Sequence, residues 1–580
     1  MNAERLLALY EQVAEAPDAV PRMRRFVLDL AVRGKLVPQE ADDEPASELL
    51  KRIAAEKARL VKAGEIRKKA AQNPKMVEPP HELPENWRWV ALGTVFLYDA
   101  GAKREPKSLD PSLWLLELED IEKETGRLVA RSSVADRESK STKSEFQVGD
   151  ILYGKLRPYL TKVLVADAPG YSTTEIVAIR PFLPLCSEYC ALALRRPDFV
   201  DYVTRLGQGT KMPRLRTEDA VVSPFPLPPL AEQRRIVAKV EDLMALLDRL
   251  EAARGAAEAT RDRLTAASLA RLTAPDLDAA EFPANARFAF AAFPTLTSRY
   301  DQINSLRRAI LRLAAHGKLA TRDPSDEPAS VLLQRIAEER TALLEAGYPN
   351  PAEAKTQIKK QSQQALPSDL PPIPQGWEWA TLQQCSLMVI DCKNKTAPYS
   401  STGIRLIRTT NVRDGELNAN DQKYVTKSTY EAWSLRAKPE PGDILITREA
   451  PMGEVCLVPE GERICLGQRM MLARLVPETI HPGFLLYSLR DPDLMARVQD
   501  KPLGMTVQHL RVGGVETLLI PVPPLAEQHR IVARVAALMA LCDRLEAALR
   551  AADTTRARLL EALLADALNP ASMQEMEAAE

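Results

Sequence analysis

The chain has 580 residues, of which 45% are hydrophobic and 27% are charged, and its formal net charge at pH 7 is −1. A chain of this length exceeds a single hydrophobic core, so we expect about three to five soluble domains; no apolar run reaches about 18 residues, which excludes a membrane span. The near-zero charge argues against a nucleic-acid-binding protein with a uniformly basic surface, so any DNA-binding charge must be local or come from partners.

The chain opens with an amphipathic helical segment followed by a proline-rich linker. Leu49, Leu50 and Ile53 lie at helical spacing and mark the apolar face of one helix. Residues 79–84 contain three prolines, which stop helices and impose extended chain. We therefore assign residues 1–85 to an N-terminal helical segment and linker, although the residues do not indicate what this segment does.

Residues 86–228 have the mixed pattern of an α+β domain. Ile151-Leu152-Tyr153 and Val163-Leu164-Val165 are typical of short strands, and glycine and proline interrupt the pattern at short intervals. Residues 189–204 have a helical pattern. Asp150, like Asp443 in the second half of the chain, follows a glycine in a turn before a strand, so we expect both to cap their turns rather than to serve a functional site.

A long helix is predicted next, within residues 229–300, which also include a linker. The motif Pro228-Pro229-Leu230-Ala231-Glu232-Gln233 opens it. Apolar residues then recur in steps of four and three, at Ile236, Val240, Leu243, Leu247 and Leu250. This heptad seam requires a partner helix, and a length of roughly 60 Å favours pairing of two such helices. The alternative is an amphipathic helix that packs on its own domain.

The second half of the chain repeats this order. Residues 301–375 form a second helical segment and proline-rich linker, residues 376–523 a second α+β domain, and residues 524–580 a C-terminal long helix. The helix-opening motif recurs 295 residues later as Pro523-Pro524-Leu525-Ala526-Glu527-Gln528. We therefore predict an α+β protein with an internal pseudo-two-fold repeat, in which two α+β domains are separated by long helices that form an antiparallel coiled-coil spacer.

Matching residues define a repeated frame, whereas the sequences between them differ. The matches pair Gly34-Lys35-Leu36 with Gly317-Lys318-Leu319, Trp87 and Trp89 with Trp377 and Trp379, and Gly149-Asp150 with Gly442-Asp443. We expect the tryptophans to pack the junction between domain and helix, with base stacking as the alternative.

Catalytic signatures are absent from the sequence. We find no phosphate-binding Gly-x4-Gly-Lys-Ser/Thr loop, no dinucleotide-binding glycine motif, no Gly-x-Ser-x-Gly elbow, no His-Glu-x-x-His motif and no Asn/Asp-Pro-Pro-aromatic motif of amino-methyltransferases. The seven cysteines form no Cys-x-x-Cys pair, which favours reduced thiols in a cytoplasmic protein over a metal site. The pattern favours a non-catalytic binding or scaffolding subunit.

The chain resembles the specificity subunits of type I DNA restriction–modification systems. The doubled Pro-Pro-Leu-Ala-Glu-Gln motif with its helix and the Trp-x-Trp entry to each domain carry the resemblance. The domain interiors add to it. They include Gly149-Asp-Ile-Leu-Tyr-Gly-Lys-Leu-Arg-Pro-Tyr159 in the first domain and Arg408-Thr-Thr-Asn-Val-Arg-Asp-Gly415 in the second. The resemblance covers nearly the whole chain.

The resemblance implies a function in DNA recognition. Each α+β domain would be a target recognition domain for one half of a bipartite double-stranded DNA target, and the helices would set the gap between the half-sites. Two modification (methyltransferase) subunits that use S-adenosylmethionine would dock on the helices. The family also allows two restriction (translocase) subunits that use ATP and Mg²⁺. No cofactor or metal would be bound by this chain, which would have no catalytic residue and no membrane contact.

Candidate DNA-binding residues follow from the chemistry of base and phosphate recognition, in which Arg and Lys bind guanine or phosphate and Asn and Gln bind adenine. In the first domain they are Lys155, Arg157, Tyr159, Lys162, Thr173, Thr174, Gln208, Lys211 and Arg214. In the second domain they are Arg405, Arg408, Thr409, Asn411, Arg413, Arg448, Gln468, Arg469 and Gln508. For each residue the alternative is a surface salt bridge or a loop hydrogen bond.

Two other classes of function remain open at this point. A two-lobed coiled-coil scaffold or interaction protein would show no sequence-dependent DNA binding. A self-contained DNA-modifying enzyme would methylate DNA by itself, which the missing motifs argue against. The pattern of methylated adenines in cells that express the chain with its genomic neighbours would separate the three classes.

Overall fold

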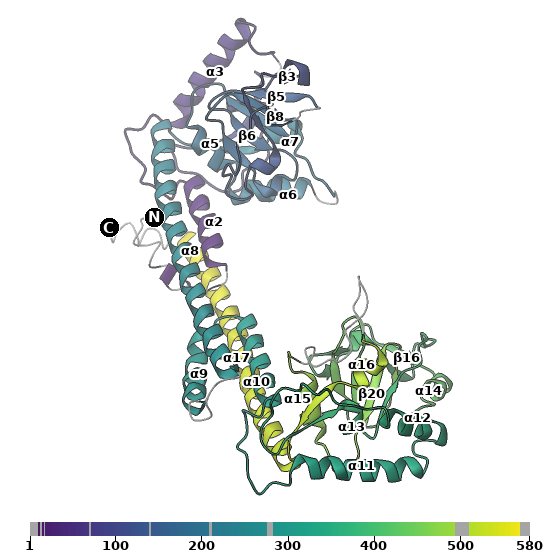
Figure 1. The fold of residues 1–580 in the computed structure, drawn as a ribbon. Helices are drawn as coiled ribbons and strands as arrows, with labels where there is room; N and C mark the ends of the chain where they lie inside the picture. Colours follow the sequence, from purple (N-terminus) through teal and green to yellow (C-terminus); the bar gives the residue numbers. More distant parts are fainter. Residues whose placement is uncertain are drawn as a thin grey trace. The chain divides into compact units, whose positions relative to one another are not determined.

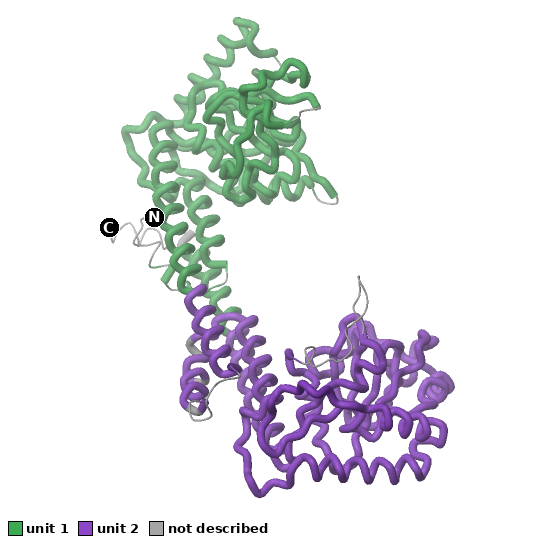
Figure 2. Tube along the Cα trace, viewed as in Figure 1, with its two compact units in different colours: residues 1–257, 552–580 green, residues 258–551 purple. Residues whose placement is uncertain are grey.

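The computed structural model of the chain describes residues 18–68, 71–137, 141–207, 211–274, 282–493 and 510–568, with scattered positions before residue 18. It divides into two compact units, which Figure 2 shows in separate colours. Unit 1 contains residues 1–257 and 552–580, and unit 2 contains residues 258–551.

Unit 1 combines helices with two four-stranded sheets, and Figure 1 labels its main elements. Its helices are α2 (Ala19–Val32), α3 (Ala46–Lys62), α4 (Leu92–Val95), α5 (Ser187–Ala193), α6 (Pro197–Leu206), α7 (Thr217–Val221) and the start of α8 (Leu230–Thr273), with 3-10 turns η1 (Pro106–Ser108), η2 (Leu118–Asp120) and η3 (Pro158–Leu160). Its strands are β1 (Arg88–Ala91), β2 (Phe96–Tyr98), β3 (Lys103–Arg104), β4 (Trp114–Leu116), β5 (Lys143–Phe146), β6 (Ile151–Gly154), β7 (Val163–Val165), β8 (Gly170–Thr173), β9 (Ile176–Pro181) and β10 (Pro224–Leu227). The strands predicted at residues 151–153 and 163–165 are confirmed as β6 and β7.

The sheets of unit 1 have the orders β2-β9-β6-β7 and β3-β5-β8-β4, and β1 pairs with β10 in a separate ribbon. Central strand β6 is buried throughout, because both of its faces are covered: Ile151 and Tyr153 belong to one apolar cluster and Leu152 to another. The helical pattern at residues 189–204 corresponds to two helices rather than one. Pro197 begins α6 and cannot continue the hydrogen bonds of α5.

Unit 2 contains the second set of elements. Its helices are α9 (Phe282–Leu296), α10 (Tyr300–Ala315), α11 (Ala329–Glu345), α12 (Pro351–Gln361), α13 (Leu382–Cys385), α14 (Lys427–Trp433), α15 (Pro482–Leu489), α16 (Val512–Glu516) and the start of α17 (Leu525–Leu568), with the turn η4 (Thr409–Asn411). Its strands are β11 (Glu378–Thr381), β12 (Met388–Asp391), β13 (Ile404–Ile407), β14 (Val412–Arg413), β15 (Glu416–Leu417), β16 (Lys423–Val425), β17 (Ile444–Thr447), β18 (Val455–Leu457), β19 (Ile464–Leu466), β20 (Met470–Arg474) and β21 (Leu519–Val522).

The main sheet of unit 2 repeats that of unit 1. Its order, β12-β20-β17-β18, matches β2-β9-β6-β7 strand for strand, and β11 pairs with β21 as β1 pairs with β10. The second sheets differ, since unit 2 has the three-stranded order β16-β13-β19. The α+β fold class and the internal repeat are therefore confirmed.

The two 44-residue helices belong to both units. Helix α8 begins in unit 1 and ends in unit 2, whereas α17 begins in unit 2 and ends in unit 1, so they run in opposite chain directions (Figure 1). The early seam residues, such as Ile236 and Val240, join the apolar core of their own unit, as the alternative interpretation expected. The end of the other helix packs against the same core, through Leu564 in unit 1 and Leu272 in unit 2. Each long helix thus packs on its own unit at its start, whereas its end packs against the core that contains the start of the other long helix.

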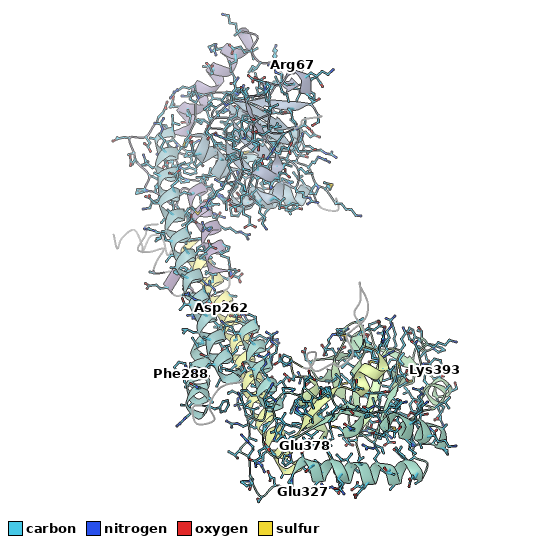
Figure 3. The ribbon with its side chains drawn as sticks, in the orientation of Figure 1. Arg67, Asp262, Phe288, Glu327, Glu378 and Lys393 are labelled. Carbon is cyan, nitrogen blue, oxygen red and sulfur yellow. The ribbon has the colours of Figure 1, made fainter. Side chains whose placement is uncertain are left out.

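The helical segments that precede each domain contribute to the bundles around the long helices. Arg24 of α2 forms ion pairs with Asp248 at 2.6 Å and Glu251 at 2.9 Å on α8. Arg307 of α10 forms the matching pairs in unit 2, with Asp543 at 2.6 Å and Glu546 at 2.8 Å on α17. Helix α9, in a stretch assigned to a linker, adds buried Ala289 and Phe293 to the core of unit 2. Figure 3 labels Asp262 on α8, which Arg299 contacts at 2.8 Å within the same bundle.

Candidate nucleic-acid interface

The repeated motif forms the joint between domain and helix. Buried Trp87 donates its indole N–H to Glu232 Oε2 at 2.9 Å, and Gln39 donates to Glu232 Oε1 at 2.6 Å. Gln233 donates to the Pro228 carbonyl at 3.1 Å and accepts from the Cys186 N–H at 3.2 Å. Burial raises the pKa of Glu232, against the effect of these hydrogen bonds.

The second copy repeats this joint. Trp377 donates to Glu527 at 3.1 Å, and Gln528 donates to the Pro523 carbonyl at 2.9 Å. Gln528 also accepts from the His481 N–H at 2.8 Å. The expected packing role of Trp87 and Trp377 is confirmed, because both are buried at the junction. The most strongly repeated residues of the sequence therefore stabilise the fold at this joint.

The turn role expected for the paired aspartates is also confirmed. Asp150 accepts from the Gln147 N–H at 2.9 Å and forms a salt bridge with Arg180 at 2.7 Å. Asp443 forms a salt bridge with Arg474, likewise at 2.7 Å, and accepts from the Glu440 N–H at 2.8 Å. Both carboxylates thus close the turn that precedes the central strand of the main sheet.

In the first domain, segments far apart in the sequence converge at the end of β6. The Lys155 N–H donates to the Glu175 carbonyl at 2.9 Å, and the Leu215 N–H donates to the Lys155 carbonyl at 2.9 Å. The Arg157 N–H donates to the Pro213 carbonyl at 2.8 Å. The structure thereby brings the segments of Lys155, Thr174 and Arg214, which lie far apart in the sequence, onto one edge.

Several candidates at this edge are exposed. Arg157, Tyr159, Thr174, Lys211 and Arg214 present their side chains to solvent. Arg157 has a left-handed backbone conformation with φ of 50°, which turns the chain sharply after β6. Among the described residues, the side chains of Arg157 and Lys211 form no hydrogen bond or ion pair. Arg214 forms a salt bridge with Glu175 at 3.0 Å.

Other candidates of the first domain lie further inside. Lys162 donates its Nζ to the Leu118 carbonyl at 2.6 Å, so its ammonium group already has an acceptor. Thr173 is half-buried, with its hydroxyl shielded from solvent. Gln208 lies outside the described residues.

The second domain has the same convergence at the end of β17. The Arg448 N–H donates to the Arg469 carbonyl at 3.0 Å, and the Leu510 N–H donates to the Arg448 carbonyl at 3.0 Å. Gln468 accepts from the Thr396 hydroxyl at 3.3 Å, and exposed Arg469 forms an ion pair with Glu449. Gln508 lies outside the described residues.

The cluster near η4 is largely occupied by contacts within the loop. Arg405 forms a salt bridge with Glu462 at 3.0 Å and Arg408 with Asp421 at 2.9 Å. The Arg413 guanidinium donates to the carbonyl of half-buried Thr409 at 2.7 Å. These four residues are partly exposed, and each of the three arginines already has a hydrogen-bond or ion-pair partner.

Asn411 serves the loop itself. Its side chain is fully buried; the amide oxygen accepts from the Arg408 N–H at 3.1 Å, and the amide nitrogen donates to the Asn420 carbonyl at 2.9 Å. Because a buried amide with these partners cannot reach a base edge, Asn411 is not part of the proposed interface.

One exposed segment was missed at the sequence level. Lys393, Asn394 and Lys395 follow β12 and are exposed; Figure 3 labels Lys393 on this loop. The segment continues into Thr396, the partner of Gln468, and Lys393 Nζ lies 4.4 Å from the centroid of the Trp433 ring. The lysines shortly after the apolar run Met388-Val389-Ile390 were the signal that could have identified it.

The described residues contain neither a metal-binding cluster nor a membrane-spanning helix. Within the described part of the chain, no group of three or more His, Cys, Asp or Glu side chains is placed to hold a metal ion. No helix in that part is long and apolar enough to cross a bilayer. All seven cysteines are free, and all but Cys186 are buried.

Comparison with known proteins identifies the family. Residues 391–552 match the model of the type I restriction modification DNA specificity domain. The specificity subunit of the type I restriction enzyme EcoAI of Escherichia coli is 31% identical over 591 residues, covering 95% of this chain and 94% of that protein. The EcoEI specificity subunit of the same species is 30% identical, with 95% and 94% covered.

A solved structure gives a further comparison. A chain from a structure of a type I restriction–modification system has 21% identity and a TM-score of 0.48, with 85% of this chain and all of that chain covered. The sequence comparisons favour the expected non-catalytic subunit and give no support to a scaffold without DNA specificity. The chain belongs to the specificity subunits of type I restriction enzymes.

Proposed function

We propose that residues 86–228 and 376–523 are two target recognition domains, each of which binds one half of a bipartite double-stranded DNA target. The observation that supports this proposal is that main-chain hydrogen bonds bring together segments with basic side chains at the same strand end in both domains. An asymmetric DNA target with a gap has two different half-sites. It therefore requires two domains of the same fold with different binding surfaces. The other proposed parts of the chain are helical. They are the two helical segments with their linkers, residues 1–85 and 301–375, and the stretches that contain the long helices, residues 229–300 and 524–580.

The DNA contacts are proposed for the side chains that remain at these edges. In the first domain they are Lys155, Arg157, Tyr159, Thr174, Lys211 and Arg214, joined by Gln208. In the second domain they are Arg448, Gln468 and Arg469, joined by Gln508, with Arg405, Arg408, Thr409 and Arg413 beside them. These basic side chains are few for binding a DNA duplex, and the net charge of the protein chain is −1. We therefore infer that partner subunits contribute positive charge.

The long helices are proposed to set the gap between the half-sites and to dock two modification subunits. S-adenosylmethionine would be bound by those partners, and ATP and Mg²⁺ by two restriction subunits that join the complex in the cytoplasm. Equivalent positions on one face of DNA recur about every 34 Å, and a 44-residue helix spans roughly 66 Å, so a helical spacer has the required reach.

Mapping of methylated adenines tests the proposal. The chain is co-expressed with the modification subunit encoded beside it, and we expect one interrupted, asymmetric methylated motif. Replacement of residues 86–228 by the corresponding domain of another specificity subunit should change one half of that motif and leave the other half and the gap unchanged. An unaltered motif, or a change in both halves, would contradict the modular proposal.

A further inference from the structure

Lys155 and Arg448 occupy the same position in the two domains. Each follows the central strand of its main sheet, β6 or β17. They are 293 residues apart, the spacing that also separates Gly149-Asp150 from Gly442-Asp443. A basic side chain therefore lies at the same repeated position in both domains, although the residue type differs.

Main-chain hydrogen bonds hold this position from both sides in both domains. The Lys155 N–H donates to Glu175 and its carbonyl accepts from Leu215, both at 2.9 Å. The Arg448 N–H donates to Arg469, and its carbonyl accepts from Leu510, both at 3.0 Å. Leu215 and Leu510 are themselves 295 residues apart, the spacing of the helix-opening motif. We call this arrangement the strand-end clamp.

The charges around each clamp are already neutralised by ion pairs. Arg214 pairs with Glu175 in the first domain, and Arg469 pairs with Glu449 in the second. Among the described residues, the side chains of Lys155 and Arg448 form no hydrogen bond or ion pair. The Arg448 Nε is buried, so the stem of this side chain is packed against the domain.

We infer that Lys155 and Arg448 are equivalent specificity-determining residues, each of which contacts a base in its own half-site; this inference rests on the proposed function. Base recognition depends on hydrogen-bond direction, so it requires a donor on a fixed backbone, whereas a phosphate tolerates a mobile one. The clamp supplies the fixed backbone. The different donors then allow one scaffold to select different bases: a forked guanidinium suits guanine O6 and N7, and an ammonium is a single charge centre.

Exchange of the two side chains tests the inference. Lys155→Arg and Arg448→Lys retain the charge, and the clamp consists of main-chain groups, so both variants should fold as the wild type does. In the complex with modification subunits, R448K should reduce discrimination at one base pair of the second half-site by roughly 10-fold or more. K155R should alter the preference at one base pair of the first half-site. The readouts are binding to a library of single-base-pair target variants and the methylated motif in cells.

Matched controls lie at another repeated position. Arg52 and Arg335 are 283 residues apart, on α3 and α11, and pair with Glu44 at 2.9 Å and Glu327 at 3.0 Å. Arg52→Lys and Arg335→Lys should leave both half-sites unchanged.

Two results would overturn the inference. One is unchanged base preference in both exchange variants, and the other is a loss of affinity that is equal for all sequences and comes with a weaker dependence on salt, which identifies a phosphate contact. A wild-type complex without any sequence preference would instead refute the proposed function.

Discussion

At the residue scale, the residues repeated between the two halves support the fold, whereas the residues proposed for DNA recognition differ. Glu232 and Glu527 are repeated because each accepts a hydrogen bond from a buried tryptophan at the joint between domain and helix. Lys155 and Arg448 share a backbone environment but carry different donors. The same frame can therefore present different chemistry to DNA.

Burial raises the pKa of Glu232 and of Glu527 above the value of 4.5 expected in the unfolded chain. For a carboxyl group with a raised folded-state pKa, the stabilising contribution is complete below the unfolded pKa and is lost as pH rises through the folded pKa. The stability of Glu232→Gln relative to the wild type should therefore increase as pH rises above about 4.5, until the carboxyl group is ionised in the folded protein. Thermal unfolding of E232Q, with E527Q as the matched variant, measures this trend. A difference that does not vary with pH would contradict the assignment.

At the element scale, the start and end of each helix depend on a few turn residues. Helix α2 ends in a left-handed turn at Gly34, with φ of 70°, and α10 ends in the same way at Gly317, with φ of 65°. Both glycines pack against the linker that enters the domain, so the matched Gly-Lys-Leu sequences reflect one close approach between segments.

Gly34→Ala tests this close approach. A Cβ at Gly34 would lie 2.4 Å from Pro84 Cγ, whereas a Cβ at Gly64, with φ of 73°, would meet nothing within 4 Å. Both substitutions cost about 1 kcal/mol through the left-handed backbone, but only G34A adds a clash with a proline ring. We expect the free energy of unfolding, measured with denaturant, to fall further in G34A than in G64A. Equal losses would indicate that the linker is free to move.

At the scale of the whole molecule, the chain is a duplicated frame whose two copies share both long helices. Helices α8 and α17 each begin in one unit and end in the other, so neither unit is complete without a segment from the other half of the sequence. Isolation of either half of the chain would expose apolar helix faces that the full chain buries.

Lengthening of both long helices tests their proposed role as a spacer. Insertion of a heptad after Gly255 in α8 and another after Arg550 in α17 keeps the seam in phase and adds about 10 Å. This length corresponds to about three base pairs, so the mapped gap should increase by about that amount or methylation should be lost. A four-residue insertion, which breaks the heptad phase, is the comparison variant. An unchanged gap with full methylation would exclude the spacer.

The order of elements could be predicted from the sequence because helical and strand periodicity are local properties. The strands at residues 151–153 and 163–165 and the helix from Leu230 to Thr273 follow directly from spacing and turn residues. Helix α9 escaped prediction because it lies between two stronger patterns in a stretch assigned to a linker. The family could be named because the doubled helix-opening motif is contiguous in sequence.

The location of the site depended on tertiary structure. Lys155 is hydrogen-bonded through its main chain to Glu175 and Leu215, which lie 20 and 60 residues further along the chain. Only burial and hydrogen bonding separate exposed Arg157 from Lys162, whose ammonium group already has a carbonyl acceptor, although both are basic residues in one loop. Sequence alone thus determined the repeated frame and its family, since those are patterns along one dimension. The folded chain decided which charges remain available for DNA, since availability depends on neighbours that the sequence keeps far apart.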